Sequence, residues 1–229
     1  VLDLEITTNR PDCLSVLGIA REVGTMYNTE ISMPELASSD DFHGEAPLSI
    51  TIDDPDWCPR YVGALADVEV GTSPQWLKTR LEAADVRPVN NVVDVTNYVM
   101  LEIGHPMHAF DHARLAGPEI RVRRAAHGER IRTLDGVERT LTPETLTIAD
   151  AERPQAVAGV MGSATSEIND GTRTVVLEAA YFNPISVRRT SKRLSLTTDA
   201  SYRFERGTDV SAPVTAIARA LQLLTAIGA

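Results

Sequence analysis

Two histidines and an aspartate stand close together in one short stretch of the chain, residues 104–111 (GHPMHAFD). His105 and His108 are three positions apart and Asp111 follows, so a metal site is one interpretation of this stretch. Pro106 between the histidines disfavours a regular ligand-bearing helix, and no third ligand follows at a familiar spacing. The alternatives are a loop that directs one imidazole into a pocket and a histidine that is hydrogen-bonded inside the core.

Two apolar segments are interrupted by polar residues. Thr96 and Asn97 lie within the apolar run 92–103, where a buried polar group without a partner costs about 1–3 kcal/mol. They either form structural hydrogen bonds across the core or line a cavity. Glu178 stands in the apolar segment 175–182 (VVLEAAYF). A buried carboxylate needs a partner or has its pKa raised, so Glu178 either pairs with a core arginine or accepts a hydrogen bond from a ligand.

Gly159 and Gly162 stand three positions apart after an apolar segment. They allow either a close approach of the backbone to a ligand or a tight bend between strands. No Lys-Ser/Thr pair follows, so this is not a phosphate-binding loop. The polar stretch 196–207 is typical of a solvated, salt-bridged turn, and a basic helix is predicted before it. That helix carries Arg188, Arg189, Lys192 and Arg193. Such a face is either solvated or in contact with phosphates.

Periodicity and turn signals predict the elements that position these residues. We predict strands at 2–6, 48–52 and 61–70, helices at 13–27, 92–103 and 210–227, and short strands throughout 119–177. Turn and cap signals are Ser73-Pro74 and Asn183-Pro184, which open two further helices, Gly104, which ends one, and the Asp135-Gly136 hairpin. Helices at both ends of a strand-rich middle favour an α+β fold over alternating βαβ units.

Composition and charge restrict the class of protein. The 229 residues are 43% apolar and 24% charged, which suits one large globular domain or two small ones. The net charge of −10 is uneven, because residues 1–60 carry −9 and residues 61–229 carry −1. Bulk charge therefore does not attract a polyanion, which leaves only a local basic surface in the second part for that purpose.

The sequence lacks the features of membrane-spanning, secreted and disulfide-rich proteins. No apolar stretch approaches the roughly 20 residues that cross a bilayer, and no secretory signal is recognisable. Cys13 and Cys58 are too few for a disulfide scaffold, so we expect a cytoplasmic protein with reduced thiols. The chain begins with Val1 rather than Met, and we expect it to be a fragment of a longer polypeptide.

Five stretches, in this order, resemble the beta subunit of bacterial phenylalanyl-tRNA synthetase. They are residues 3–23 (DLEITTNRPDCLSVLGIAREV), 90–111 (NNVVDVTNYVMLEIGHPMHAFD), 157–163 (VAGVMGS), 175–184 (VVLEAAYFNP) and 197–207 (TTDASYRFERG). The resemblance implies an α+β editing domain, a β-sandwich of unusual topology with flanking helices, at residues 48–229. It also implies the C-terminal half of a discontinuous small helical domain at 1–35. The polar, acidic composition of residues 36–47 is typical of a linker between the two.

The resemblance implies a function as well. The chain would hydrolyse tyrosine wrongly attached to tRNA(Phe), and its partners would be the acceptor end of that tRNA and the alpha subunit of a heterotetramer with two alpha and two beta chains. ATP and magnesium would belong to the synthetic site of the whole enzyme, which leaves no cofactor or metal in this chain. The alternatives are a non-catalytic scaffold that docks RNA and a stand-alone editing protein, which the incomplete first domain and absent Met disfavour.

Residue roles are implied by the same resemblance. The carboxylate that recognises the phenol would be Glu178, and the glycines that leave room for the substrate would be Gly159 and Gly162. Thr198 and Ala200 match the opposite wall. The polar groups around the ester match His108, Thr96, Asn97 and Arg87. We expect His108, with Thr96 and Asn97, to orient a water molecule or the terminal adenosine, and the four cations at 188–193 to contact the acceptor end.

Overall fold

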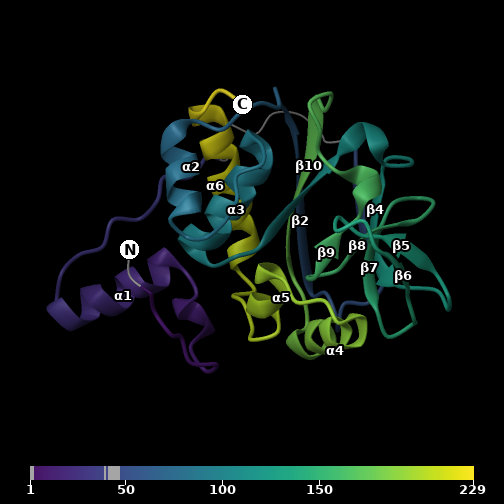
Figure 1. Cartoon of the computed structure of the whole chain (residues 1–229), viewed down its shortest axis with the longest axis horizontal. Helices are drawn as coiled ribbons and strands as arrows, with labels where there is room; N and C mark the ends of the chain where they lie inside the picture. Colours follow the sequence, from purple (N-terminus) through teal and green to yellow (C-terminus); the bar gives the residue numbers. More distant parts are fainter. Residues whose placement is uncertain (1–2, 39, 41–46) are drawn as a thin grey trace.

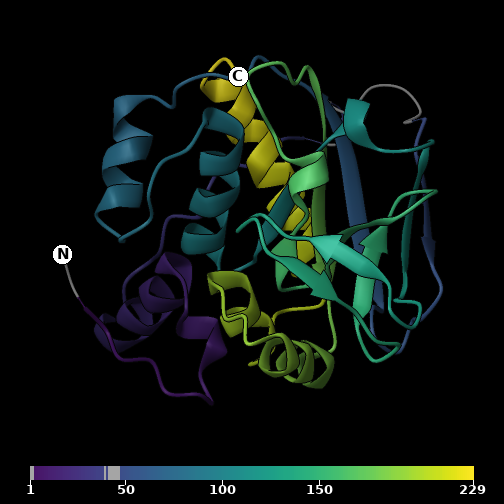
Figure 2. The ribbon, with the colours of Figure 1, turned by 45° about the vertical axis from the view of Figure 1, so that its right-hand side comes forward.

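The computed structural model describes residues 3–38, 40 and 47–229 of the chain and arranges them in layers (Figure 1). One layer consists of helices, the middle layer is a three-stranded sheet, and the third is a five-stranded sheet. Two further helices, α4 and α5, lie at one end of the two sheets (Figures 1 and 2). The predicted α+β fold with two packed sheets and flanking helices is therefore confirmed.

The helices and turns of 3-10 helix are η1 (Pro11–Cys13), α1 (Val16–Tyr27), α2 (Gln75–Glu82), α3 (Asn91–Ile103), η3 (His112–Arg114), η4 (Ala164–Ser166), α4 (Pro184–Leu194), α5 (Asp199–Phe204) and α6 (Ala212–Ala226). The strands are β1 (Ser49–Ile52), β2 (Arg60–Asp67), β3 (Met107–Asp111), β4 (Glu119–Arg124), β5 (Arg130–Arg132), β6 (Glu138–Thr140), β7 (Leu146–Ala149), β8 (Pro154–Val157), β9 (Met161–Gly162) and β10 (Thr174–Tyr181). In the part of the chain described, no helix is both long enough and apolar enough to cross a membrane.

The two large sheets have different topologies. The five-stranded sheet has the order β1-β4-β7-β8-β9, in which β1 is parallel to β4 and the other neighbours are antiparallel. The three-stranded sheet has the order β2-β10-β3, and both of its pairings are antiparallel. A small hairpin, β5-β6, forms around Asp135-Gly136 as predicted. The central strand β10 comes last in the sequence and joins two strands that do not pair with each other.

Strand β10 separates two hydrophobic cores. Val176 and Ala180 face a core between the two sheets, whereas Val175, Leu177 and Ala179 face a second core against α3 and α6. Alternate side chains of a strand point to opposite faces, so β10 is covered on both faces and is apolar almost throughout. The Glu178 side chain points to the same face as Val176 and Ala180, between the two sheets.

Several of the predicted helix boundaries are confirmed. Gly104 ends α3 with a left-handed φ of +84°, which favours glycine at that position. The Asn183 side chain caps α4 by accepting hydrogen bonds from the backbone N–H groups of Ile185 and Ser186, and Pro184 occupies the first turn. These two boundaries fix the ends of elements that lead into the candidate site.

Two local predictions are wrong. Residues 3–6 form no strand, and Leu4 is 48% exposed, because no strand in the described part of the chain pairs with them; Leu2 lies outside the described residues. Ser73 does not cap α2, which begins after Pro74 without a side-chain cap. The Ser73 hydroxyl instead donates a hydrogen bond to Asp94 of α3, which satisfies a buried carboxylate.

The described part of residues 3–40, the N-terminal segment, packs against the rest of the protein, residues 47–229, which we call the body (Figure 2). The Arg203 Nε of α5 donates to the Leu14 carbonyl oxygen at 3.3 Å. Further along, the Ala37 backbone N–H donates to the Ala218 carbonyl oxygen of α6. The predicted linker therefore touches the body at Ala37, while residues 39 and 41–46 lie outside the described part.

Candidate active site

The central strand of the three-stranded sheet brings together two residues that are far apart in the sequence. In the pairing of β10 with β3, Glu178 lies directly opposite His108. On the other side of β10, Glu178 lies opposite Gly63 of β2. Directly opposed side chains share one face of a sheet and are near neighbours. The register therefore places the carboxyl group and the imidazole side by side.

The carboxyl group of Glu178 is buried and has no partner. The residue is 5% exposed, and no hydrogen bond or ion pair joins its side chain to any residue that the structure describes. No arginine in that part of the chain forms the salt bridge to Glu178 that was considered as one alternative. Burial raises the pKa of Glu178 to about 8, so the group is mostly protonated at neutral pH. A protonated carboxyl group both donates and accepts hydrogen bonds.

The imidazole of His108 is also buried. Its Nε2 atom has no hydrogen-bond partner among the described residues, and its ring packs edge-on against Phe110 with 4.5 Å between centroids. Burial lowers the pKa of His108 to about 4, so the ring is neutral at pH 7. A neutral imidazole can orient a ligand or water, but a pKa so far below 7 makes it a weak general base.

The two predicted glycines serve different purposes in the structure. A Cβ atom at Gly162 would overlap Cε1 and Nε2 of His108, so the missing side chain makes room for the imidazole. Gly159 has a left-handed φ of +68°, and a Cβ there would meet Phe182 and Val187 at 3.0 Å. The backbone between β8 and β9 therefore turns close to β10, and the predicted space for a substrate stays a prediction.

A small cavity of about 60 Å³ lies over this face of β10. Its wall includes His108, Gly159, Gly162, Glu178 and Ala200, so the structure brings five of the predicted site residues together. Apolar side chains complete the wall, among them Ile148, Met161, Phe182 and Phe204. Ligand pockets typically measure about 300–1,000 Å³. A tyrosyl group would therefore have to displace some of the lining side chains.

Thr198 holds one wall of the cavity in place without lining it. It caps α5, and its hydroxyl donates to the Val160 carbonyl oxygen at 2.8 Å. This bond ties the start of α5 to the turn between β8 and β9. Ala200, two residues later, consequently lies at the cavity wall.

Like Thr198, three further residues predicted to surround the substrate lie outside the lining of this cavity. The Thr96 hydroxyl donates to the Val93 carbonyl oxygen of its own helix at 2.7 Å. Asn97 is half-buried on α3, and Arg87 is exposed in the loop before that helix. Their predicted roles around the ester are neither confirmed nor contradicted by this arrangement.

The segment before Thr96 has a structural role that the sequence did not reveal. The Asn91 side chain donates to the Glu69 carbonyl oxygen and accepts from the Gly71 N–H. Asp94 accepts from the Ser73 hydroxyl. These bonds anchor the first turn of α3 to the preceding loops, and a polar residue at a helix start is the only sequence signal for them.

Tyr61 and Cys58 are further residues near Glu178 that sequence reasoning did not single out. Both belong to the core between the sheets, and the Tyr61 hydroxyl has no partner among the described residues. Burial, with a smaller contribution from the Glu178 charge, raises the pKa of Cys58 to about 12 and that of Tyr61 well above its usual value. Alternation along β2 predicts the side on which Tyr61 lies, but only the sheet order shows that β2 is next to β10.

The basic face of α4 lies at the end of the two sheets (Figure 1). Arg188, Arg189 and Lys192 are exposed and form no ion pair with the described residues, whereas Arg193 pairs with Glu144 at 3.2 Å. A shallow cavity of about 440 Å³ adjoins this face. Three cations on α4 are therefore available to an anionic partner.

A larger cavity lies elsewhere. It measures about 640 Å³ and lies between the N-terminal segment, the end of α3 and the loop before α6. His105 lines it, but none of the predicted site residues does. Cavity size is therefore a poor guide to the site here, because the smaller cavity contains the carboxyl group with the strongly raised pKa.

The described residues give no support to a metal site at residues 104–111. The ligand atoms of His105, His108 and Asp111 do not gather within 4.8 Å of one another. The Asp111 carboxylate instead accepts hydrogen bonds from Thr172 and Asn169, which fixes the end of β3.

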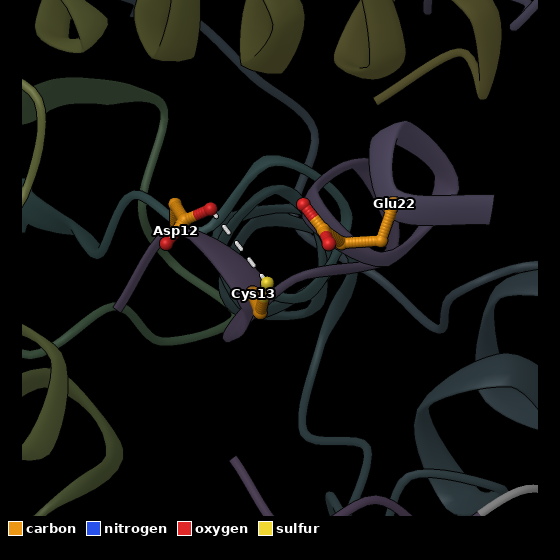
Figure 3. A group of neighbouring side chains, drawn as sticks. All are labelled: Asp12, Cys13 and Glu22. Atoms are coloured by element: carbon orange, nitrogen blue, oxygen red, sulfur yellow. Dashed lines mark hydrogen bonds between the residues drawn. The ribbon is translucent and has the colours of Figure 1, made fainter. Parts of the chain in front are cut away.

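A second group of potential ligands lies in the N-terminal segment, where Asp12, Cys13 and Glu22 approach one another (Figure 3). Arg10 donates to both carboxylates, at 2.8 Å and 2.6 Å. Burial raises the pKa of the Cys13 thiol, whereas a metal ligand must be a thiolate. The guanidinium of Arg10 therefore already pairs with both carboxylates, where a metal ion would have to bind.

Comparisons with known proteins place the chain among relatives. The sequence model of the family described as "B3/4 domain" matches residues 57–229. The chain is 52% identical over 227 residues to the phenylalanine–tRNA ligase beta subunit of Carboxydothermus hydrogenoformans and 51% identical over 231 residues to that of Geobacter metallireducens. Each alignment covers 98% of this chain but 28% of the relative, so the chain spans less than a third of these proteins.

A solved structure was also matched. It is an N-terminal fragment of the phenylalanyl-tRNA synthetase beta subunit from Pyrococcus horikoshii, 17% identical, with a TM-score of 0.43. The match covers 81% of this chain and 59% of that one.

Proposed function

The chain belongs to the B3/4 domain family, and from that membership and the cavity over Glu178 we propose that it hydrolyses the ester of tyrosine mischarged on tRNA(Phe). The observation that carries the proposal is a buried, unpaired carboxyl group in the wall of an otherwise largely apolar cavity. The similarity to phenylalanine–tRNA ligase beta subunits supports it, because it extends over nearly the whole chain.

The need for such a site follows from the chemistry of the two amino acids. Tyrosine is phenylalanine with one added hydroxyl, and a hydrophobic pocket rejects an added hydroxyl by only about a hundredfold. A second site that hydrogen-bonds the phenol discriminates in the opposite direction, because phenylalanine would leave the buried acceptor unpaired. Glu178 is the acceptor in this proposal.

The proposed reaction is a simple hydrolysis. The oxygen of a water molecule bonds to the ester carbonyl carbon, the bond to the ribose oxygen breaks, and that oxygen takes up a proton. Because the ester is already activated, no protein nucleophile is needed. Neutral His108 orients the water or the terminal adenosine through Nε2, with Thr96 and Asn97 as further polar groups. The neighbouring ribose hydroxyl of the tRNA assists.

The proposal extends to partners and location. The acceptor end of tRNA(Phe) would contact Arg188, Arg189 and Lys192 on α4, with Arg193 beside them. The alpha subunit would complete a heterotetramer of two alpha and two beta chains, in which ATP and magnesium serve the synthetic site. The assembly would work in the cytoplasm.

The test compares hydrolysis of Tyr-tRNA(Phe) by the wild type, Glu178→Ala and His108→Ala, both in this chain and in a whole ligase that contains it. We expect Glu178→Ala to lower kcat/KM for the tyrosine ester about ten- to a hundredfold, the equivalent of about 1–3 kcal/mol. His108→Ala should lower kcat. Glu167→Ala, which removes an exposed acid, is the control. Unchanged rates in both site variants contradict the assignment.

A non-catalytic scaffold that docks RNA is the second candidate. The small volume of the cavity, about 60 Å³, favours it, because a vestigial pocket would have closed. A scaffold binds tRNA through α4 without hydrolysing Tyr-tRNA(Phe), whereas the editing proposal requires hydrolysis by the same preparation.

A further inference from the structure

Tyr61 is a buried polar residue beside Glu178 to which the proposed function gives no role. On β2, Tyr61 is paired with Ala180 of β10, and Gly63 is paired with Glu178. Residues two apart on a strand share a face, so Tyr61 and Glu178 are diagonal neighbours on the same side of the sheet. Side chains in this relation lie about 7–8 Å apart at Cα, within the reach of an aromatic ring.

The hydroxyl of Tyr61 is a free donor. It is buried and makes no hydrogen bond to the described residues, and its pKa is raised well above the usual value by burial and by the Glu178 charge. It therefore keeps its proton at neutral pH. A buried donor without a partner is costly, so its position beside an equally unpaired carboxyl group calls for an explanation.

The other titratable groups around Glu178 are poorer donors. His108 faces it from β3, but its neutral ring carries only one N–H, and the proposed function already assigns Nε2 to the water or adenosine. Cys58 precedes β2, and its thiol donates to the Arg60 carbonyl oxygen at 3.4 Å. The five-stranded sheet and α5 contribute no further titratable side chain to the cavity wall. Of these described groups, Tyr61 alone has a hydroxyl proton to which the proposed function assigns no role.

We propose that Tyr61 is the positioning residue of the phenol-binding carboxyl group: its hydroxyl donates a hydrogen bond to Glu178 from behind when Glu178 ionises. Tyr61 does not line the cavity, so it acts through Glu178 rather than on the ligand. A hydrogen bond to the charged form of an acid stabilises that form. In the structure neither group has a partner; the proposed bond forms when the carboxylate appears, because a charged acceptor binds a donor more strongly than a neutral one.

This inference rests on the proposed function only for its effect on selectivity. Its central claim concerns the ionisation of Glu178, which is measurable without a substrate. Carboxyl carbon NMR of the chain labelled at glutamate gives the pKa of Glu178 directly, and Glu178→Gln identifies the signal. Tyr61→Phe removes one oxygen and retains the ring, so the packing of the core is preserved.

We expect the pKa of Glu178 to rise by about one in Tyr61→Phe, because a lost hydrogen bond to a charged group weakens the ionised form. Tyr181→Phe is the matched control. Tyr181 lies three residues along the same strand, hence on the opposite face, and the pKa of Glu178 should not change there. An unchanged pKa of Glu178 in Tyr61→Phe, with thermal unfolding showing an intact fold, overturns the inference.

A kinetic measurement separates this inference from the proposed function. Tyr61→Phe should raise KM for Tyr-tRNA(Phe) about tenfold in a whole ligase that contains the chain, while hydrolysis of Phe-tRNA(Phe) stays the same. If no variant hydrolyses either ester but the pKa of Glu178 still rises, the editing proposal fails and the role of Tyr61 stands. If Tyr61→Phe slows both esters equally, the effect is structural and the positioning role is wrong.

Discussion

Three polar groups near the cavity are buried without partners among the described residues: the Glu178 carboxyl group, Nε2 of His108 and the Tyr61 hydroxyl. Each such group costs about 1–3 kcal/mol, so the fold would be more stable with apolar residues in their places. A cluster of unpaired polar groups is instead suited to ligand recognition. A ligand that forms hydrogen bonds with these groups gains binding free energy, because the protein alone provides no partners for them. The raised pKa of Glu178 and the lowered pKa of His108 have the same cause, because burial without a partner disfavours the charged form of each group.

The substitution Gly162→Ala tests whether hydrolysis and stability depend on the observed position of the His108 imidazole. The new Cβ would overlap the His108 ring, so the ring must move. We expect hydrolysis of Tyr-tRNA(Phe) to fall at least tenfold and the free energy of unfolding, from urea titration, to drop by about 1–3 kcal/mol. Gly71→Ala is the control, because no atom lies within 4 Å of its added Cβ. Wild-type behaviour of Gly162→Ala would show that the ring adapts at no cost.

Buried Glu178 predicts a characteristic pH dependence of stability. Its pKa is about 8 in the folded protein, above its ordinary value of about 4.3. The folded state therefore holds the proton more tightly, and stability falls as pH rises from about 4.5 to about 8. The folded-state pKa of His108 is lowered to about 4, so its contribution rises with pH up to about 6.5 and levels off above that.

The measurement is the melting temperature of the wild type and Glu178→Gln between pH 6.5 and 8. The amide does not titrate, so we expect the variant to gain relative to the wild type as pH increases across this range. Glu167→Gln at an exposed position provides the comparison. Parallel curves for wild type and Glu178→Gln would mean that the folded protein accommodates the charge.

At the scale of the elements, local signals located helices better than they located the site. The left-handed Gly104 and the Asn183-Pro184 pair mark the ends of α3 and α4 because caps are short-range chemistry. The family resemblance alone assigned Glu178 and His108 to one site, and only the structure shows that they lie opposite each other, since this depends on a pairing across 70 positions. Tyr61 was not found because its closeness to Glu178 depends on the same sheet order.

The cap of α4 provides a prediction about stability. The Asn183 side chain accepts from two backbone N–H groups, and replacing such a cap by alanine costs about 1 kcal/mol. We expect Asn183→Ala to lower the free energy of unfolding by that amount in urea titration. Ser211→Ala is the matched control, because Ser211 stands at the N-cap of α6 without a side-chain hydrogen bond and should lose almost nothing. Equal losses in the two variants would refute the role of the cap.

At the scale of the whole molecule, charge opposes the proposed partner. The net charge is −10, yet an RNA chain is a polyanion, so binding has to rely on local cations. Arg188, Arg189 and Lys192 form such a group on α4, at the end of the sheets. The cavity over β10 and this basic face meet through α4 and α5, which pack together. The basic face of α4 thus lies close to the cavity that holds the buried acid.

Charge reversal on α4 tests this arrangement. We expect Arg188→Glu/Arg189→Glu in a whole ligase that contains the chain to weaken tRNA(Phe) binding, most strongly at low salt. Each lost phosphate contact should reduce the slope of log K against log[salt] by about 0.7–0.9. Lys78→Glu on α2, on the far side of the molecule (Figure 1), should leave the slope unchanged. The same affinity for wild type and double variant at every salt concentration would exclude α4 from the interface.

The position of Glu178 on β10 has a consequence for how this protein can change. A strand that packs against a hydrophobic core on each face tolerates few substitutions. The sequence of β10, which forms the rear of the cavity, should therefore change little. Its front is the turn between β8 and β9 with the first turn of α5, and the Thr198–Val160 hydrogen bond joins these two segments. A changed preference of the cavity for the size or shape of an amino acid should therefore arise from substitutions in that front, while Glu178 and its strand stay unchanged.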